Sequence, residues 1–422
     1  MRIIYLHQYF AFPEASSGTR SWEIARRLIQ SGHSVHMLCS SALLPGDPAS
    51  KRWIYRTEKQ GLQLSVLDVK YSNKMGFWRR IMSFFSYAVL ASYEICRLNG
   101  HLVFATSTPL TIAIPAIVGK LFHGVPMVLE IRDLWPELPI AIGALRNPLL
   151  KWLARALEKT AYSRADHVVA LSPGMAAGVK RVCPWQSVTV IPNACDVDLF
   201  QKPAEDEVRH LRARLKLEMD EKLVLYAGTL GRINGVHFLV ELAKRLRTTA
   251  PEVRFLIIGD GAEKRTVTDL AREYGVLNNN LSIWPPLPKL QMPAVFALST
   301  VSTSLFVPLR EMWNNSANKF FDSLASFTPL AINYAGWQAE ILKSSGAGIV
   351  LPSDNLDEAS KMLASLVRSE ERLGSARKAA QELATREFDR DRLVQVLEEK
   401  LTEIYRKDQK QKTDRISHLK QE

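Results

Sequence analysis

Cysteine is scarce in this chain of 422 residues, and its four cysteines (39, 96, 183 and 195) show no CxxC or other metal-ligand spacing. We therefore assign them no disulfide and no metal chemistry. The chain also lacks any run of about 18 uninterrupted apolar residues, which argues against a transmembrane helix. A full GxGxxG motif is missing as well, which argues against an NAD or FAD site. Because no cleavable signal pattern precedes the first strand, we expect a cytoplasmic protein.

Positive charge is concentrated in the first half of the sequence. The net charge is +12, and residues 1–200 hold 22 Lys and Arg against 13 Asp and Glu, so that +9 of the excess lies there and +3 in the remainder. Nucleic acid, anionic lipid or a phosphorylated substrate would each explain a basic half, and charge alone does not choose among them. The basic residues are dispersed and no nucleic-acid-binding module is recognised, so we expect no nucleic-acid partner.

Strand-like and helix-like segments alternate twice along the chain, which predicts an α/β protein with two doubly wound halves. We place an N-terminal domain at 1–195, a C-terminal domain at 196–385, a helix at 386–406 that packs back on the N-terminal domain, and a polar tail at 407–422. We expect this tail to be a frayed helix or disordered. The predicted strands are 3–6, 34–38, 101–106, 126–131, 167–171, 224–227, 255–258, 282–284 and 301–306.

The stretch NNSANKFFDSLASFTPLAINYAGWQAEI, from Asn314 to Ile341, combines a loop, a helix and a short strand. The Asn-Asn-Ser trio can cap a helix that begins near Ala317. Lys319 falls in the first turn of that helix, where the helix dipole disfavours a cation and free N–H groups favour an anion. Together they suggest a phosphate site, with Asp322 one turn later able to accept hydrogen bonds from a ribose. A solvated lysine on an ordinary helix is the alternative.

Two further loops show the same phosphate-binding character. Gly18 lies where the first loop meets a helix, so backbone there can approach a diphosphate closely. The second loop, GTLGRING, begins at Gly228, and its Arg232 lies among glycines that let backbone and guanidinium reach one phosphate. Asp196 and Asp198 form a DxD triplet of the kind that holds a metal in some sugar transferases. Because it follows a Pro-Asn turn at the linker, we interpret the triplet as structural and predict no metal site.

Two segments of the first half carry further signals. The turn RDLWPE follows a buried strand, and the carboxyl ends of strands are where open α/β sheets place ligands. Its Asp133 is therefore a candidate site residue, with a helix cap paired to Arg132 as the alternative. Residues 75–95, MGFWRRIMSFFSYAVLASYEI, form an aromatic and aliphatic helix with cations at its start. The apolar run is too short to span a bilayer, and it fits either core packing or contact with anionic lipid.

Several motifs, in their order and spacing, resemble retaining glycosyltransferases of the GT-B fold, over a region from Met1 to about Tyr405. Within that group the chain is similar to bacterial surface-polysaccharide enzymes of family four, including the transferases that add N-acetylfucosamine to lipid-linked O-antigen units. Besides the stretch at 314–341, the motifs are RDLWPE (132–137), ADHVVALSPGM (165–175), IPNACDVDLF (191–200), YAGTLGRINGV (226–236) and LIIGDGAEK (256–264).

This resemblance implies two Rossmann-like domains that face a cleft and hold an NDP-sugar donor, which we expect to be UDP-linked, mostly on the second domain. Arg232 and Lys319 would bind the diphosphate, with backbone at Gly18 and the helix starting near Ser316. The usual Arg and Lys of the family's phosphate loop fall at Thr229 and Asn234, so Arg232 has to supply much of the charge. No metal or other cofactor is expected.

The family's paired glutamates, with seven residues between them, fall at Asn314 and Asp322. Asp322 keeps a carboxylate for the ribose, whereas Asn314 can hydrogen-bond the donor sugar but carries no charge. The resemblance also places Pro286 in the segment that contacts the base and Glu340 beneath the donor. Asp133 is the expected acceptor-side carboxylate. The catalytic candidates are thus Asp133, Arg232 and Lys319, and the donor-binding candidates are Gly18, Pro286, Asn314, Ser316, Asp322 and Glu340.

In such an enzyme the acceptor hydroxyl attacks on the face from which the diphosphate leaves, and the protein acts by positioning and electrostatics. We expect a polyprenyl-diphosphate-linked saccharide as acceptor, and a peripheral position on the cytoplasmic membrane, where anionic lipid meets the basic first half. Two alternatives stay open. A GT-B sugar-nucleotide epimerase would convert the UDP-sugar without an acceptor, and a basic nucleic-acid-binding protein would show a strongly salt-dependent gel shift.

Overall fold

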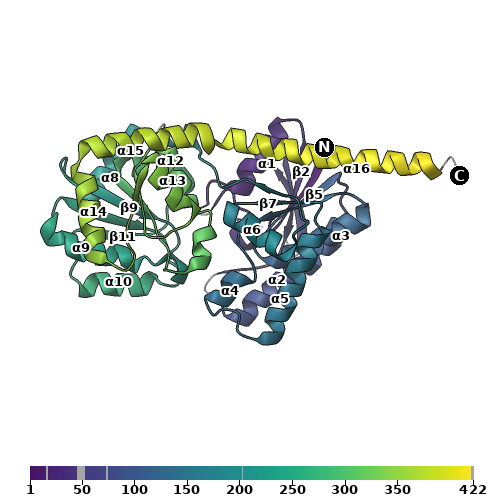
Figure 1. Cartoon of the computed structure of the whole chain (residues 1–422), viewed down its shortest axis with the longest axis horizontal. Helices are drawn as coiled ribbons and strands as arrows, with labels where there is room; N and C mark the ends of the chain where they lie inside the picture. Colours follow the sequence, from purple (N-terminus) through teal and green to yellow (C-terminus); the bar gives the residue numbers. More distant parts are fainter. Residues whose placement is uncertain (16–17, 45–52, 73–74, 202, 420–422) are drawn as a thin grey trace. The chain divides into compact units, whose positions relative to one another are not determined.

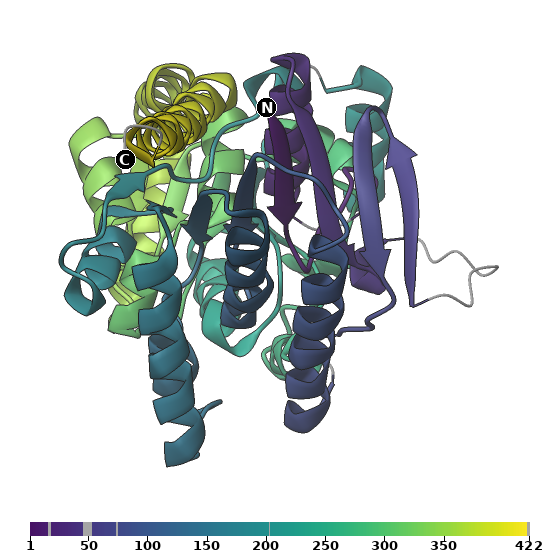
Figure 2. The same cartoon turned by 90° about the vertical axis from the view of Figure 1, so that its right-hand side faces the viewer.

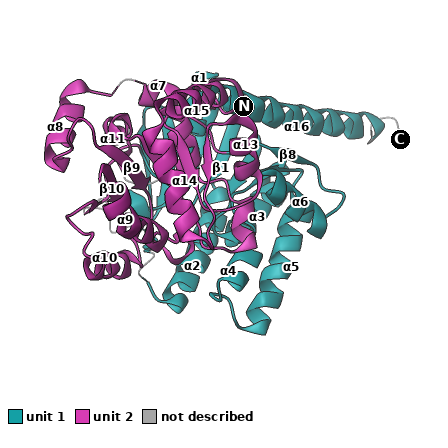
Figure 3. Ribbon diagram, turned by 60° about the vertical axis from the view of Figure 1, so that its left-hand side comes forward, with its two compact units in different colours: residues 1–12, 18–192, 391–422 teal, residues 13–17, 193–390 magenta. Residues whose placement is uncertain are grey.

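A computed structural model describes the chain except for residues 16–17, 45–52, 73–74, 202 and 420–422. The chain divides into two compact units (Figure 3). Unit 1 comprises Met1–Phe12, Gly18–Pro192 and Asp391–Glu422, and unit 2 comprises Pro13–Ser17 and Asn193–Arg390. Each unit contains one mainly parallel sheet covered by helices, so the predicted pair of Rossmann-like α/β domains is confirmed (Figure 1).

The sheet of unit 1 has the strand order β3-β4-β2-β1-β5-β6-β7-β8. All neighbouring strands are parallel except the edge pair β3 and β4, which the alternating pattern of the sequence did not predict. The order reverses between β1 and β5, which lie side by side and form the topological switch point of this sheet. The strands are β1 (Arg2–Leu6), β2 (Ser34–Ser40), β3 (Ile54–Lys59), β4 (Leu62–Leu67), β5 (Leu102–Thr106), β6 (Met127–Ile131), β7 (His167–Ala170) and β8 (Val188–Val190).

Helices cover both faces of this sheet. On one face α2, α3 and α5 lie side by side (Figure 2) and pack on the strands through apolar residues such as Tyr87, Ala116 and Tyr162. On the other face α1 and α16 pack through Trp22, Leu28 and Leu397, among others. The helices are α1 (Arg20–Gln30), α2 (Phe77–Ile95), α3 (Ala113–His123), α4 (Glu137–Ala141), α5 (Pro148–Arg164), α6 (Pro173–Val182) and α16 (Arg390–Leu419), with short 3₁₀ helices η1 (Ser41–Leu43) and η2 (Leu110–Ile112).

Local sequence explains where several of these helices begin and end. The Asn147 side chain accepts hydrogen bonds from the amides of Leu149 and Leu150, and a proline follows it at the first helical position of α5. Ser172 caps α6 in the same way, by accepting from the amide of Met175. Gly124 ends α3 in a left-handed conformation with φ 59°, which glycine adopts without steric cost.

The sheet of unit 2 is entirely parallel, with the order β11-β10-β9-β12-β13-β14. Here the order reverses between β9 and β12, so the carboxyl ends of these two strands mark the expected ligand position. The strands are β9 (Lys222–Ala227), β10 (Val253–Ile258), β11 (Leu281–Trp284), β12 (Val301–Ser304), β13 (Leu330–Ile332) and β14 (Gly348–Val350).

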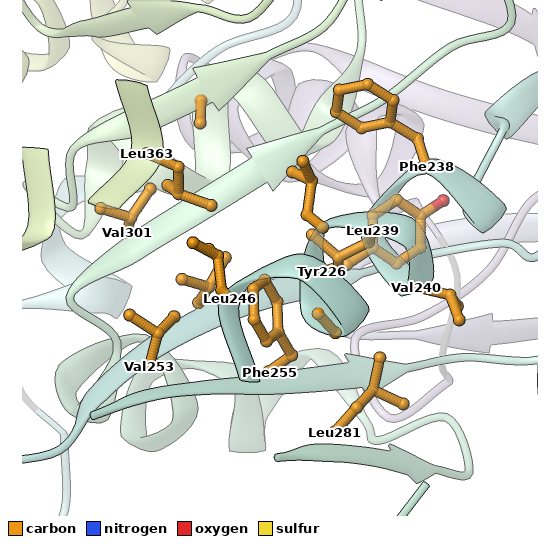
Figure 4. Packing of buried hydrophobic residues seen from close by; sticks show 14 of the residues in the cluster. Tyr226, Phe238, Leu239, Val240, Leu246, Val253, Phe255, Leu281, Val301 and Leu363 are labelled. Atoms are coloured by element: carbon orange, nitrogen blue, oxygen red, sulfur yellow. The ribbon is translucent and has the colours of Figure 1, made fainter. Parts of the chain in front are cut away.

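The core of unit 2 forms where α9 and α14 pack on this sheet. Figure 4 shows Leu239 and Leu246 of α9 beside Tyr226 and Phe255 of the sheet, all of them buried. The helices are α7 (Val197–Phe200), α8 (Glu205–Leu215), α9 (His237–Thr249), α10 (Lys264–Glu273), α11 (Met292–Leu298), α12 (Asn318–Ala325), α13 (Trp337–Ser345), α14 (Leu356–Arg368) and α15 (Glu370–Glu382), with the short turns η3 (Arg232–Asn234), η4 (Lys289–Gln291), η5 (Arg310–Asn314) and η6 (Leu383–Glu387).

The C-terminal helix is longer than the sequence indicated. Its buried residues Val394, Leu397 and Leu401 belong to the core of unit 1. The tail that we expected to be frayed or disordered continues this helix to Leu419, with the Lys412 ammonium paired to the Asp408 carboxylate one turn earlier. Among the described residues, no helix combines the length and apolar character that crossing a membrane requires.

Candidate active site

Lys319 lies at the switch point of unit 2. It belongs to the first turn of α12, and its side chain passes over Gly228, the residue that follows β9. A Cβ atom at Gly228 would lie 2.5 Å from Lys319 Cε and 3.1 Å from Nζ, so a larger residue there would displace the end of this side chain. Lys319 Nζ lies 5.3 Å from the centroid of the Tyr226 ring. The lysine is thus held between the end of β9 and the start of α12.

The segment before α12 is anchored differently from our prediction. The N-cap of α12 is Ala317, and no side chain caps the helix, so the expected cap by the Asn-Asn-Ser trio is wrong. Ser316 instead accepts a hydrogen bond at Oγ from the Asn193 amide, and its carbonyl accepts one from Asn193 Nδ2 at 2.6 Å. Because no side chain in the described part of the chain caps α12, the N–H groups of Asn318 and Lys319 keep their capacity for an external acceptor.

Burial lowers the pKa of Lys319 to about 8, although the nearby Asp322 carboxylate acts in the opposite direction. A desolvated ammonium interacts more strongly with an anion than a hydrated one does, because less water screens its charge. Lys319 and the start of α12 therefore form an anion site, in which a diphosphate oxygen would find a cation and backbone donors together.

The lowered pKa of Lys319 gives a pH prediction. The ammonium is charged below its pKa and loses its proton as the pH rises through about 8. From pH 7 to 9.5 we expect the Kd for UDP to rise, by at most roughly tenfold per pH unit. Calorimetric titration of UDP at several pH values checks this, with Lys319→Met as control, whose weaker affinity should stay nearly constant over the same range. Equal slopes for both proteins would contradict the assignment.

Asp322 has a partner that the sequence did not reveal. Its carboxylate forms an ion pair with the Lys289 ammonium of η4, and both side chains are largely buried. Lys289 also lies over the Phe200 ring, with Nζ 4.8 Å from the ring centroid. The pair fixes the Asp322 carboxylate one turn along α12 from Lys319, and one carboxylate oxygen stays available for a hydroxyl donor.

The glycine-rich loop after β9 is tightly packed on the loop after β10. A Cβ atom at Gly259 would lie 1.9 Å from the Gly228 carbonyl oxygen, and one at Gly261 would lie 2.3 Å from that of Leu230. Larger residues at these two positions would push the loops apart. Arg232 stands outside this contact, with 86% of its side chain exposed and Nε 3.6 Å from a Glu263 carboxylate oxygen. The structure thus brings Gly228 and Lys319 together but leaves Arg232 on the surface.

The remaining donor-side candidates lie on nearby loops of unit 2. Asn314 is the last residue of η5. The next residue is held by Trp337, whose Nε1 donates a hydrogen bond to the Asn315 carbonyl at 2.9 Å. A Cβ atom at Gly336 would lie 2.3 Å from the Trp313 carbonyl oxygen, so glycine is needed there too. Glu340 lies in the first turn of α13, where it is exposed and pairs with Lys343.

Pro286 occupies an exposed position in the loop after β11, at the same edge of the sheet as Gly228. It belongs to a segment that leaves the strand next to β10, two strands away from β9. The structure therefore places Pro286 farther along that edge of the sheet than Gly228. No contact of this residue distinguishes it further.

In unit 1, Asp133 follows β6 and is half-buried. Burial raises the pKa of its carboxyl to about 6, and the adjacent Arg132 charge opposes this shift only partly. Asp133 does not cap a helix, since the next helix begins at Glu137 with Pro136 as its N-cap. Gly18 is exposed and lies two residues before α1; the neighbouring Ser17 lies outside the described residues.

A buried ion pair that the sequence did not indicate supports this edge of unit 1. Arg20 of α1 donates through Nε and Nη2 to the Glu130 carboxylate of β6, at 3.1 and 2.8 Å. Thr106 donates to the other carboxylate oxygen, and Arg20 also donates to the carbonyls of Ile191 and Pro192. Burial alone would raise the pKa of Glu130, but the Arg20 charge and these hydrogen bonds hold it below its usual value.

Asp196, the first residue of the DxD triplet, has a buried partner in unit 2. The Asp196 carboxylate forms an ion pair with the Arg390 guanidinium, whose Nη2 also donates to the Ala194 carbonyl at 2.8 Å. Among the residues that the structure describes, no group of three or more His, Cys, Asp or Glu side chains is arranged to hold a metal ion. The Asp196 carboxylate thus takes part in a structural ion pair.

Comparison with known proteins matches this architecture to sugar-transferring enzymes. Residues 17–194 match the family model of the glycosyl transferase 4-like domain, and residues 207–383 match that of the glycosyl transferases group 1. The Escherichia coli glycosyl transferase WcaI, named for colanic acid biosynthesis, is 22% identical over 67% of this chain and 70% of its own length. The lipopolysaccharide 1,2-N-acetylglucosaminetransferase of Salmonella typhimurium is 25% identical over 31% of this chain and 36% of its own length.

Solved structures show the same fold. Sucrose-phosphate synthase from Thermosynechococcus elongatus superimposes with a TM-score of 0.75 at 15% identity, covering 96% of this chain and 99% of that structure. WaaG, a glycosyltransferase involved in lipopolysaccharide biosynthesis, gives a TM-score of 0.70 at 12% identity over 95% of this chain and 99% of its own. These structures show that the two units form a GT-B fold. With both family models matched in order, the chain belongs to the group 1, family-four-like glycosyltransferases.

Proposed function

We propose that this enzyme is a retaining glycosyltransferase that moves a sugar from a UDP-linked donor to a lipid-linked oligosaccharide precursor of a surface polysaccharide. An N-acetylfucosamine or a related deoxy or amino sugar is our choice of donor sugar. The observation that carries the proposal is the desolvated Lys319 ammonium, seated over Gly228 at the start of α12. Anabaena HepE, a structure of the same fold with a TM-score of 0.69, was solved in complex with UDP and glucose.

The chemistry follows from where charge develops. The bond between the donor sugar C1 and the diphosphate oxygen breaks, and negative charge collects on the departing diphosphate. Lys319 and the N–H groups of α12 stabilise this charge, and Arg232 can swing toward it from its exposed position. The acceptor oxygen then bonds to C1 on the same face, and its proton passes to the departing diphosphate. No metal is required in this scheme, since protein cations neutralise the leaving group.

Unit 1 carries a surface that suits a lipid-linked acceptor. We define the apolar rim as the exposed residues Phe77, Trp78, Met82 and Phe85 of α2 together with Leu149, Trp152 and Leu153 of α5. Both helices run antiparallel to the strands that they connect, so their N-terminal ends lie at the carboxyl edge of the sheet (Figure 2). Arg79 and Lys151 lie among these side chains. Aromatic residues beside cations are typical of surfaces that bind anionic lipid.

This surface gives a prediction for membrane binding. We expect the protein to float with vesicles that contain 30% anionic lipid, and the double variant Trp78→Glu, Phe85→Glu to lose most of this binding. The two glutamates would remove apolar contacts and add repulsion from the lipid charge. Trp185→Glu is the matched control, because Trp185 is 68% exposed but precedes β8 at the opposite edge of the sheet. Equal flotation of the double variant and the control would contradict a membrane role for the apolar rim.

The proposed reaction is tested by its product. The purified enzyme is incubated with UDP-sugars and a bacterial lipid extract, with EDTA present, and the glycolipid formed is analysed by mass spectrometry and by NMR of the new anomeric centre. We expect a lipid-linked product that keeps the donor's anomeric configuration. An inverted centre would overturn the retaining mechanism. Conversion of a UDP-sugar when no lipid extract is added would favour an epimerase instead.

A further inference from the structure

Two buried polar side chains mark the switch point of unit 1. His7 and Gln8 follow β1 directly, and β1 pairs with β5 where the strand order reverses. His7 is 3% exposed and Gln8 is 0% exposed. In unit 2 the equivalent position, after β9, holds the Gly228 and Lys319 site. Open α/β sheets bind their ligands at this position, but the proposed function gives neither His7 nor Gln8 a role.

The partner of His7 determines which of its ring nitrogens carries the proton. Arg132 Nη1 lies 3.3 Å from His7 Nε2. A guanidinium only donates hydrogen bonds, so Nε2 is the acceptor and the proton resides on Nδ1. Burial and the Arg132 charge both hold the pKa of His7 well below its usual value, and the ring stays neutral. Among the described residues, the Nδ1–H group has no hydrogen-bond partner.

The side-chain amide of Gln8 also lacks hydrogen-bond partners among the described residues, at both its oxygen and its nitrogen. Its backbone is fixed, because the Gln8 carbonyl accepts from Ser40 Oγ at 2.6 Å and from the Ser40 amide at 3.0 Å. Its side-chain oxygen and nitrogen, however, are buried and have no partner in the described part of the chain. An unpartnered buried polar group costs about 1–3 kcal/mol. Leucine or methionine would avoid this cost, so the two polar residues indicate a ligand that completes their hydrogen bonds.

The chemistry of these atoms points to an uncharged ligand. A neutral N–H donor and an amide, which donates and accepts, match sugar hydroxyl and acetamido groups, and the one charged donor beside them, Arg132, is directed at His7 Nε2. A row of aromatic rings lies alongside: Tyr9 contacts Tyr71 at 4.5 Å between centroids, Tyr71 contacts Phe84 at 5.8 Å, and Phe84 contacts Trp135 at 6.4 Å. Phe84 belongs to α2, the helix that carries much of the apolar rim.

We propose that His7 Nδ1–H and the Gln8 amide form a subsite that binds the acceptor saccharide through its hydroxyl or acetamido groups. The inference rests on the proposed function and deepens it, since it assigns the sugar next to the reacting hydroxyl to unit 1. Arg132 acts on the saccharide only through His7, whose tautomer it fixes. Arg132 is therefore a positioning residue, and His7 and Gln8 make the contacts.

Binding of short-chain polyprenyl-diphosphate-linked hexoses and N-acetylhexosamines tests this subsite. We expect His7→Phe and Gln8→Leu each to weaken binding of the preferred probe about tenfold, as the loss of a buried hydrogen bond implies. His7→Asn keeps an N–H group near the position of Nδ1 and should stay within about threefold of the natural protein. His36→Asn on β2, where the ring bonds to Ser65, is the control and should change nothing. UDP-induced stabilisation should be the same in all these variants.

Several outcomes would overturn the subsite. Unchanged probe affinity in His7→Phe and Gln8→Leu would do so, and so would a protein that is stabilised by UDP but binds none of the probes. If UDP itself gave no stabilisation, the donor site of the proposed function would fail instead, which separates the two failures. Nitrogen-15 NMR of the His7 ring gives an independent reading that needs no ligand and applies also if His7→Phe does not fold. We expect a neutral ring protonated on Nδ1 from pH 6 to 8, and a ring protonated on Nε2 would contradict the proposal.

Discussion

Replacing Lys319 by alanine is expected to lower kcat for glycosyl transfer by about 10²- to 10³-fold, the size of effect seen when one preorganised donor to a developing charge is removed. The side chain lies in a desolvated position between Gly228 and the start of α12, where it can stabilise the departing diphosphate. Because the charge on the diphosphate grows during the reaction, kcat should fall more than KM for the donor rises. Steady-state kinetics at saturating acceptor measure both.

Two further variants show whether kcat depends on the position of the Lys319 ammonium or only on the number of lysines in unit 2. Lys361→Ala removes an exposed lysine of α14 and should leave kcat unchanged. Gly228→Ala keeps Lys319 but adds a Cβ atom 2.5 Å from its Cε, so it should displace the ammonium and lower kcat as well. A Lys319→Ala enzyme that retains kcat within threefold of the natural enzyme would show that the diphosphate binds elsewhere.

Replacing Glu130 by alanine should produce the largest loss of stability. It leaves the Arg20 guanidinium buried without its carboxylate, a change that costs about 3–5 kcal/mol in proteins. For a unit of this size such a loss lowers Tm by roughly 6–20 °C. Scanning calorimetry should show this shift in the transition of unit 1, while Glu403→Ala, which breaks an exposed pair with Lys400, serves as the control with little change.

The pH dependence of this pair has a definite sign. Because the folded-state pKa of Glu130 lies below its ordinary value of 4.5, the pair's contribution is fully present above that value and is lost as pH falls through the folded pKa. The Tm difference between the natural protein and Glu130→Ala should therefore shrink in acid. Replacing both partners, as Arg20→Met with Glu130→Leu, should restore part of the lost Tm, since no charge remains buried alone. A shift below about 2 °C in Glu130→Ala would contradict a stabilising pair.

The overall fold could be predicted because its signals are local. Each strand and helix shows its own period of apolar residues, and the alternation of the two patterns repeats along both halves of the chain. The start of α12 was predicted near Ala317, one residue from its observed position, but from a cap by the Asn-Asn-Ser trio that does not form. Ser316 Oγ accepts a hydrogen bond from the Asn193 amide, more than a hundred residues earlier in the chain, instead of capping α12. Local sequence gives no sign of a partner so far away.

Only part of the candidate site is indicated by local sequence motifs. Gly228 and Lys319 each stand out in their own loops, but their contact depends on β9 and β12 being neighbours. Lys289 and Asp322 are 33 residues apart, and Arg132 and His7 are 125 residues apart, so neither pair leaves a local pattern. A local motif can also fail to show where a side chain lies. Arg232 was predicted as a phosphate ligand because it lies among glycines, whereas in the structure its exposed side chain lies near the Glu263 carboxylate.

The tail beyond residue 406 has few apolar residues, and this led to a prediction that differs from the structure. Its polar composition offers little to bury, which we interpreted as fraying or disorder. The same stretch contains neither proline nor glycine, and Lys412 pairs with Asp408 at helical spacing, so the long helix α16 continues to Leu419. Helix propensity and local ion pairs suffice there once the preceding turns are anchored on unit 1 by Leu397 and Leu401.

We propose that unit 2 binds a nucleoside diphosphate through Lys319 and Asp322. Thermal stabilisation by UDP, GDP, ADP and dTDP measures this binding. At a hundredfold excess over Kd, binding adds roughly 2.7 kcal/mol to the stability of the folded state. We expect UDP to raise the Tm of the natural protein by several degrees, and neither Lys319→Ala nor Asp322→Ala to respond in this way, although Lys361→Ala does. No shift with any of the four nucleotides, or an equal UDP shift in Lys319→Ala, would contradict it.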